Sequence, residues 1–140
     1  MPCLHSHPAY TPAPPYNVIL HGDLIFENDN CIVKVRRGFV SDGGSIPRIF
    51  WSLLGVTPYD PRCVYAFILH DYLYRSESVP RLVADRILLE VLQIEPRCRL
   101  LQRLAIWAAV RLAGWLAWLD HNPLSVIEAH GQGQVKYKNL

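Results

Sequence analysis

The sequence predicts an α+β fold that is mainly α, with an N-terminal β-hairpin followed by a three-helix core that contains an antiparallel helix pair. Two patterns indicate this class. Residues 17–41 are rich in Val, Ile and Phe, a composition that favours strands. Beyond residue 48 the apolar positions recur at helical spacing to about residue 119. The 140 residues, 51% of them hydrophobic, suffice for one domain with a packed core.

The hairpin belongs to a single globular domain that is expected to cover residues 17–120. Residues 1–16 carry five prolines, which predict an extended arm. Strands are expected over residues 18–27 and 31–40, with a turn at 28–30, where the sequence reads Asn-Asp-Asn. Pro123 and the glycines at 131 and 133 interrupt the last segment, so residues 121–140 are expected to form a loosely structured tail.

Three helices are predicted near residues 61–75, 79–95 and 97–119. Pro61 and Pro80 each fall in a first turn, where proline is tolerated, and Pro96 ends the second helix. The first helix is apolar on more than one face, so it should be central. The first two helices are joined by only three residues, 76–78, and should therefore form an antiparallel hairpin.

Charge and composition exclude several functions. The net charge of +2 is too small, and the basic residues too scattered, to indicate a nucleic-acid partner. The N-terminus lacks a basic region followed by an apolar run, so no signal peptide is expected. The apolar stretch 104–119 is about 16 residues long with Arg111 near its middle, whereas a spanning helix needs about 20 apolar residues. No transmembrane helix is therefore expected.

A histidine and an aspartate on the predicted helix pair are the strongest candidates for chemistry. His70 and Asp85 each stand about seven or eight residues from the middle of the turn, and positions equidistant from a turn lie side by side in an antiparallel hairpin. Asp85 shares one helical stripe with leucines at 88, 89 and 92, so it should face inward. A buried carboxylate needs a partner. The pattern predicts a hydrogen bond between His70 and Asp85.

Such a pair could activate water. An imidazole titrates near pH 6.5, and His70 would bind Asp85 through one nitrogen and face water with the other. Asp71 points about 100° around the helix, where its carboxylate could hold a hard cation. Tyr74 is one turn away and could brace Asp85. The alternative is a structural His–Asp–Tyr network that ties two helices together.

The loop at residues 41–47, which reads Ser-Asp-Gly-Gly-Ser-Ile-Pro, is a candidate for ion binding. Gly43 and Gly44 permit unusual backbone angles, so the loop can present carbonyls or amides to an ion or an oxyanion, with Asp42 beside them. A plain turn after the hairpin explains the same residues equally well.

The motif His70-Asp71-x-x-Tyr74, followed on the next helix by Asp85, resembles the core of the phospholipase A2 superfamily, and most closely its compact bacterial and viral branches. The resemblance implies that His70 is the general base, that Asp71 is a calcium ligand, and that Asp85 orients His70 with support from Tyr74. It also implies that the Gly43-Gly44 loop lends backbone carbonyls to calcium and an oxyanion donor.

A second resemblance covers more of the chain. Residues 38–48 (GFVSDGGSIPR), 70–74 (HDYLY) and 84–86 (ADR) are together similar to a family of small proteins of unknown function found in tailed phages and prophages. This resemblance implies a phage origin and a place in the virion or the host cytoplasm. It implies no reaction.

Three functions are consistent with these residues. The first is a calcium-type lipid ester hydrolase that acts on a phospholipid or membrane surface. The second is a non-enzymatic virion component, in the tail or tail tip, whose partners are phage structural proteins. The third is a zinc-dependent hydrolase or peptidase in which Asp42, His70 and either Asp71 or Asp85 bind the metal. For the first, an interfacial surface is expected from Trp51, Trp107, Trp115, Trp118 and Arg111.

Overall fold

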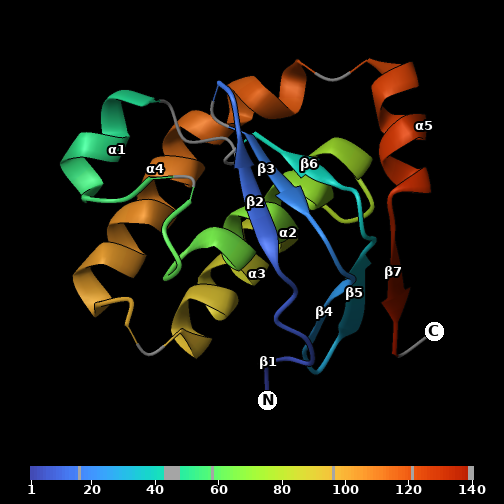
Figure 1. Ribbon diagram of the computed structural model, residues 1–140, viewed down its shortest axis with the longest axis horizontal. Helices are drawn as coiled ribbons and strands as arrows, with labels where there is room; N and C mark the ends of the chain where they lie inside the picture. The colour runs from blue at the N-terminus through green and yellow to red at the C-terminus, as the bar shows by residue number, and fades with distance from the viewer. Residues whose placement is uncertain (16, 43–47, 58, 96, 121, 139–140) are drawn as a thin grey trace.

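The computed structural model describes every residue of the chain except 16, 43–47, 58, 96, 121 and 139–140. Its described strands are β1 (Cys3–Leu4), β2 (Tyr10–Ala13), β3 (Asn17–Leu20), β4 (Leu24–Glu27), β5 (Cys31–Val35), β6 (Val40–Ser41) and β7 (Gly133–Tyr137). They form two antiparallel sheets, one ordered β1–β4–β5–β7 and the other β2–β3–β6 (Figure 1).

The helices within the described residues are α1 (Arg48–Leu54), α2 (Val64–Ser76), α3 (Arg81–Ile94), α4 (Leu100–Leu119) and α5 (Pro123–Gly131). Helix α2 is the central one. It contacts α3, α4 and α5, and it also contacts β5 of one sheet and β6 of the other (Figure 1). Nearly all of its side chains are buried, as its continuous apolar run predicts.

The predicted fold class was wrong, because strands from both ends of the chain build two sheets where a single hairpin was expected. The proline-rich segment supplies β1 and β2, and the expected tail supplies α5 and β7. Pro12 is tolerated because β2 is an edge strand, whose outer side needs no ladder hydrogen bond. Strand β7 pairs with β5 from Cys31↔Tyr137 to Val35↔Gly133. Local sequence does not encode such long-range pairing.

The strand expected over residues 18–27 is two strands, β3 and β4, which belong to different sheets. The expected turn at 28–30 does join β4 to β5. Asn28 stabilises it, because its Oδ1 accepts hydrogen bonds from the backbone N–H groups of Asn30 and Cys31, both at 2.9 Å. Such a turn is a common use of asparagine.

Helix α5 was missed, although the sequence carries a start signal for it. Asn122 caps the helix with Oδ1, which accepts the Ser125 N–H at 2.9 Å, while Ser125 Oγ accepts the Asn122 N–H at 3.2 Å. Pro123 occupies the first helical turn, where its fixed φ is favourable. An Asn-Pro-x-Ser sequence is thus a capping box, here obscured by the glycines that follow.

Helix α4 presents an apolar surface to solvent. Within the described residues it is the one helix whose length and composition would let it cross a membrane, a test that core helices of soluble proteins also pass. Only 22% of its most apolar 18-residue stretch is buried in the protein, so α4 is not an ordinary core helix. Its exposed apolar residues are Leu100, Leu101, Leu104, Leu112, Trp115, Leu116 and Leu119.

Candidate functional site

The site is built on α2 and α3, which run side by side as the short turn between them predicts. Helix α2 ends at Ser76 and is capped by Glu77, which adopts a left-handed conformation with φ of 48°, and Pro80 precedes α3. Across this pair, His70 Nε2 lies 2.8 Å from Asp85 Oδ1. Both side chains are buried, with exposed fractions of 1% and 0%. The predicted contact is therefore present.

Tyr74 completes the predicted trio. Its hydroxyl donates to the same oxygen, Asp85 Oδ1, at 2.6 Å. The Tyr74 ring also lies over the imidazole of His70, one helical turn away, with ring centroids 4.0 Å apart. On its other side Tyr74 contacts the edge of Trp118 from α4. These contacts hold the imidazole and the carboxylate in one arrangement.

Two arginines that were not predicted as site residues also bind this network. Arg111 of α4 donates to Asp85 Oδ2 at 2.6 Å, and the Arg81 Nε lies 3.9 Å from the same oxygen. Arg81 also donates to the Tyr74 hydroxyl at 3.1 Å. Arg111 was expected on an interfacial surface; in the structure it is partly exposed and donates to the buried Asp85. An arginine within an apolar helix was the available signal, because such a charge seeks a carboxylate.

The hydrogen bonds determine the protonation of the pair. Burial acts to raise the pKa of Asp85, but donors from His70, Tyr74 and Arg111 bring it below its ordinary value. Burial lowers the pKa of His70, although Asp85 opposes this. Nε2 is the ring nitrogen that faces Asp85, so a neutral imidazole can donate to the ionised carboxylate only if Nε2 carries the proton. The other ring nitrogen, Nδ1, then has a free lone pair and can act as a base.

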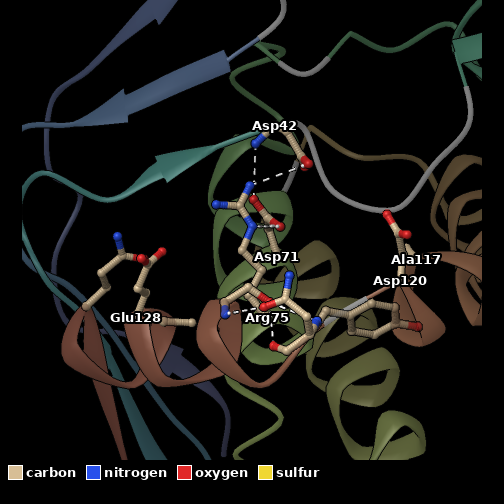
Figure 2. A pocket seen from close by; sticks show the side chains of 11 residues that line it. Asp42, Asp71, Arg75, Ala117, Asp120 and Glu128 are labelled. Atoms are coloured by element: carbon tan, nitrogen blue, oxygen red, sulfur yellow. Dashed lines mark hydrogen bonds and ion pairs between the residues drawn. The ribbon is translucent and has the colours of Figure 1, made fainter.

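Asp71 lies next to His70 on α2 and is 4% exposed. Its Oδ2 accepts the backbone N–H of Asp42 at 3.1 Å, and its Oδ1 lies 3.0 Å from Arg75 Nε. Arg75 also approaches the Asp42 carboxylate at 3.4 Å, so it bridges the two acids, as Figure 2 shows. Burial first, and then the charge of Asp42, raise the pKa of Asp71 to about 7, although Arg75 opposes this shift.

Asp42 and Asp71 line a pocket of about 410 Å³. Tyr74 and Arg75 supply more of the α2 wall, and the opposite side comes from the end of α4 and from α5 (Figure 2). His70 is not among its lining residues; it lies beneath Tyr74 and beside Asp71. The other lining residues are Ala117, Asp120, Asn122, Ser125, Glu128, Ala129 and Gln132.

The remaining predicted metal ligands, Gly43 and Gly44, lie outside the described residues. Asp42 and Asp71 offer the carboxylate oxygens that calcium prefers. Arg75 occupies the space between these oxygens, so a cation bound there would have to displace its guanidinium group. Calcium and zinc both stay predictions at this site.

Residues 18–110 match the model of a family described as a protein of unknown function (DUF1353). The chain belongs to this family. The matched range contains His70, Asp71 and Asp85 but ends one residue before Arg111, and it omits the α5 side of the pocket. The DUF1353 description states no activity, and it names neither phages nor phospholipases.

A relative of this DUF1353 protein is known from Sinorhizobium fredii, where it bears the name "Uncharacterized protein y4jT". The two are 35% identical over 60 residues, which cover 42% of this chain and 18% of the relative. The chain thus spans less than a fifth of that relative's length. No solved structure matches the chain.

Proposed function

We propose that this protein is a metal-assisted hydrolase of lipid esters in which His70 activates water. The hydrogen bond from His70 Nε2 to Asp85, shared with Tyr74, is the observation that carries the proposal. It holds the imidazole in the tautomer whose Nδ1 can take a proton. The motif resemblance to the phospholipase A2 superfamily belongs to the same proposal, as does the phage origin that the second resemblance implies.

Asp85 acts by orientation and charge. Its ionised carboxylate keeps the Nε2 proton in place and stabilises the imidazolium that forms when Nδ1 accepts a proton from water. Donors from His70, Tyr74 and Arg111 keep the carboxylate ionised although it is fully buried. The pair therefore does not depend on solvent to maintain its charge.

Asp71 and Asp42 would hold the metal, which fits calcium because both donors are hard oxygens. When bound, calcium would polarise the ester carbonyl. Without a cation, Arg75 bridges the two acids. Within the described residues, the donor atoms of His70, Asp42 and Asp71 do not gather closely enough to share one metal ion. The zinc alternative is accordingly less well supported here.

A lipid substrate is favoured by the apolar residues beside the pocket. The segment from α4 to α5 that forms one wall of the pocket also exposes large apolar side chains on both helices. Contiguous exposed apolar surface is typical of membrane or partner contact. These residues are Leu112, Trp115, Leu116, Leu119, Leu124 and Ile127.

Fatty-acid release from phospholipid vesicles tests the proposal. Wild-type protein should release fatty acid with calcium, and chelation should abolish release. His70→Gln should lower the rate by about 10²-fold or more, the scale of lost acid–base catalysis, and Asp71→Asn should abolish release because it removes a calcium ligand. The exposed His130→Gln is the matched control and should keep full activity. Each variant is checked for folding by thermal melting.

The second candidate is a non-enzymatic virion component, and the burial of the network favours it. His70 is 1% exposed and Asp85 is 0% exposed, which suits a brace between helices. Wild-type protein that is folded yet inert on lipids, with or without calcium, would contradict the hydrolase and favour this candidate. Activity on a peptide that depends on zinc would instead favour a zinc hydrolase.

A further inference from the structure

Three side chains of metal-binding type converge at the edge of the four-stranded sheet, away from the α2–α3 site. Cys3 and His5 project from the same face because strand side chains alternate. Glu27 of β4 is the register partner of Cys3. The ladder continues past β1, where the His5 N–H donates to the Ile25 carbonyl at 2.9 Å. Pairing of the N-terminal segment with β4 thus places the three side chains together on one patch of the sheet edge.

The donor atoms are close enough to share an ion. Cys3 Sγ lies 3.4 Å from His5 Nε2, which lies 2.5 Å from Glu27 Oε2, and all three atoms lie within 4.8 Å of one another. In a tetrahedral zinc site, bonds of about 2.3 Å to sulfur and about 2.0 Å to nitrogen separate these two ligands by about 3.5 Å. The sulfur–nitrogen distance already has that value.

We propose that Cys3, His5 and Glu27 form a zinc-binding site that clips β1 to β4. Thiolate, imidazole and carboxylate are all zinc ligands, and a thiolate disfavours calcium and magnesium. Three protein ligands leave the fourth position to solvent. The His5–Glu27 contact must open from 2.5 Å to about 3.3 Å, which a side-chain rotation of the partly exposed glutamate can provide.

The charges around Glu27 suit this role. Lys138, which follows β7, forms an ion pair with Oε1 and leaves Oε2 toward His5. When zinc binds, the Cys3 thiol loses its proton to solvent and the sulfur becomes the ligand.

The site would stabilise a weakly held edge. Strand β1 pairs with β4 at Cys3 and Leu4, and one more backbone hydrogen bond follows at His5, so the paired stretch is short. A zinc ion would link β1 directly to β4. The proposal is independent of the hydrolase, because it involves no residue of the α2–α3 site.

Cobalt titration of the reduced, metal-free full chain tests the site. Cobalt bound to a thiolate gives a sulfur-to-metal charge-transfer band in the near ultraviolet, and zinc should bleach that band by displacement. Cys3→Ser should remove the band, and His5→Asn should weaken binding at least about ten-fold. His7→Asn is the matched control, since His7 is exposed on the same segment but outside the cluster.

A second readout follows the thiol itself. Cys31, Cys63 and Cys98 are buried, whereas Cys3 is partly exposed, so a thiol reagent should label Cys3 first in the folded protein. Zinc should slow that labelling in wild type and in His7→Asn, but not in His5→Asn. Absence of the cobalt band in wild type, its persistence in Cys3→Ser, or equal weakening by His5→Asn and His7→Asn would each overturn the proposal.

Discussion

Asp85 is the residue on which the hydrogen bonds of the site converge. Its two oxygens accept from His70, Tyr74 and Arg111, and Arg81 lies nearby. A carboxylate without exposed surface is tolerated only because these donors replace water. Removing it leaves a partly buried guanidinium group, a buried hydroxyl and a buried imidazole without their acceptor.

Asp85→Ala should therefore lower the free energy of unfolding by about 3–5 kcal/mol, the range for breaking one side of a buried charged pair. Urea denaturation at neutral pH measures this. Asp29→Ala is the control, because Asp29 is largely exposed and should change stability little. If Asp85→Ala and Asp29→Ala had the same free energy of unfolding, the network would contribute nothing to the stability of the fold.

Asp71 should make stability depend on pH. Its folded-state pKa of about 7 is above that of an unfolded aspartate, so between about pH 4 and pH 7 the folded state binds more protons than the unfolded state. The free energy of unfolding must then fall as pH rises through that window. Asp71→Asn removes the ionisation, so the variant should be more stable than wild type at pH 8, by about 1–4 kcal/mol.

The advantage of Asp71→Asn should shrink toward zero near pH 4, where the wild-type carboxyl is protonated in the folded state and about half protonated in the unfolded state. Thermal melts of both proteins at pH 4, 6 and 8 provide the comparison. Parallel stability curves for the two proteins across that range would show that Asp71 is ionised normally in the folded state.

At the scale of elements, α4 approaches α2 closely at Gly114. A methyl group added at Gly114 would lie 2.7 Å from the Tyr74 hydroxyl oxygen and 3.3 Å from the nearest ring carbon. Tyr74 cannot yield freely, because its hydroxyl is held by Asp85 at 2.6 Å. The absence of a side chain at Gly114 is thus a packing requirement of the site.

Gly114→Ala should destabilise the protein by about 1–3 kcal/mol, the usual range for overpacking, even though alanine favours helix. Chemical denaturation gives the value. Gly131→Ala is the matched control at the end of α5, where an added methyl group meets nothing within 4 Å. That variant should be neutral or slightly stabilising. If Gly114→Ala had the same free energy of unfolding as wild type, α4 would be able to shift away from Tyr74 at little cost.

At the scale of the whole molecule, α4 and α5 together present apolar side chains beside the pocket. Leu116 and Leu119 are 57% and 69% exposed, and both border a shallow hollow next to the pocket. If this surface enters a lipid interface, each leucine contributes up to about 1.5–3 kcal/mol by burial. The double variant Leu116→Glu, Leu119→Glu should therefore bind phospholipid vesicles at least about ten-fold more weakly.

Co-sedimentation with vesicles measures that binding. Leu82→Glu is the control, since Leu82 is 51% exposed on α3 but does not line the pocket. It should bind vesicles as wild type does. Equal loss of vesicle binding in Leu82→Glu and in the double variant would indicate that the α4–α5 surface does not contact lipid. Absence of binding by wild type would indicate the same.

The sequence by itself determined the contact between His70 and Asp85. A short turn fixes which positions of two antiparallel helices lie opposite, and the leucine stripe directs Asp85 inward. Both signals lie within the helix pair itself, so they can be read without knowing the structure of the rest of the chain. Tyr74 followed for the same reason, one helical turn from His70.

Tertiary structure alone decided the remainder. Strand β7 pairs with β5 across about a hundred residues, Arg111 reaches Asp85 from a third helix, and Cys3 meets Glu27 through strand register. Each contact joins two segments that are far apart in the sequence, and neither segment's own sequence shows which other segment it will contact. Their pairing depends on how buried surfaces and backbone hydrogen bonds are satisfied together, which only the assembled chain specifies.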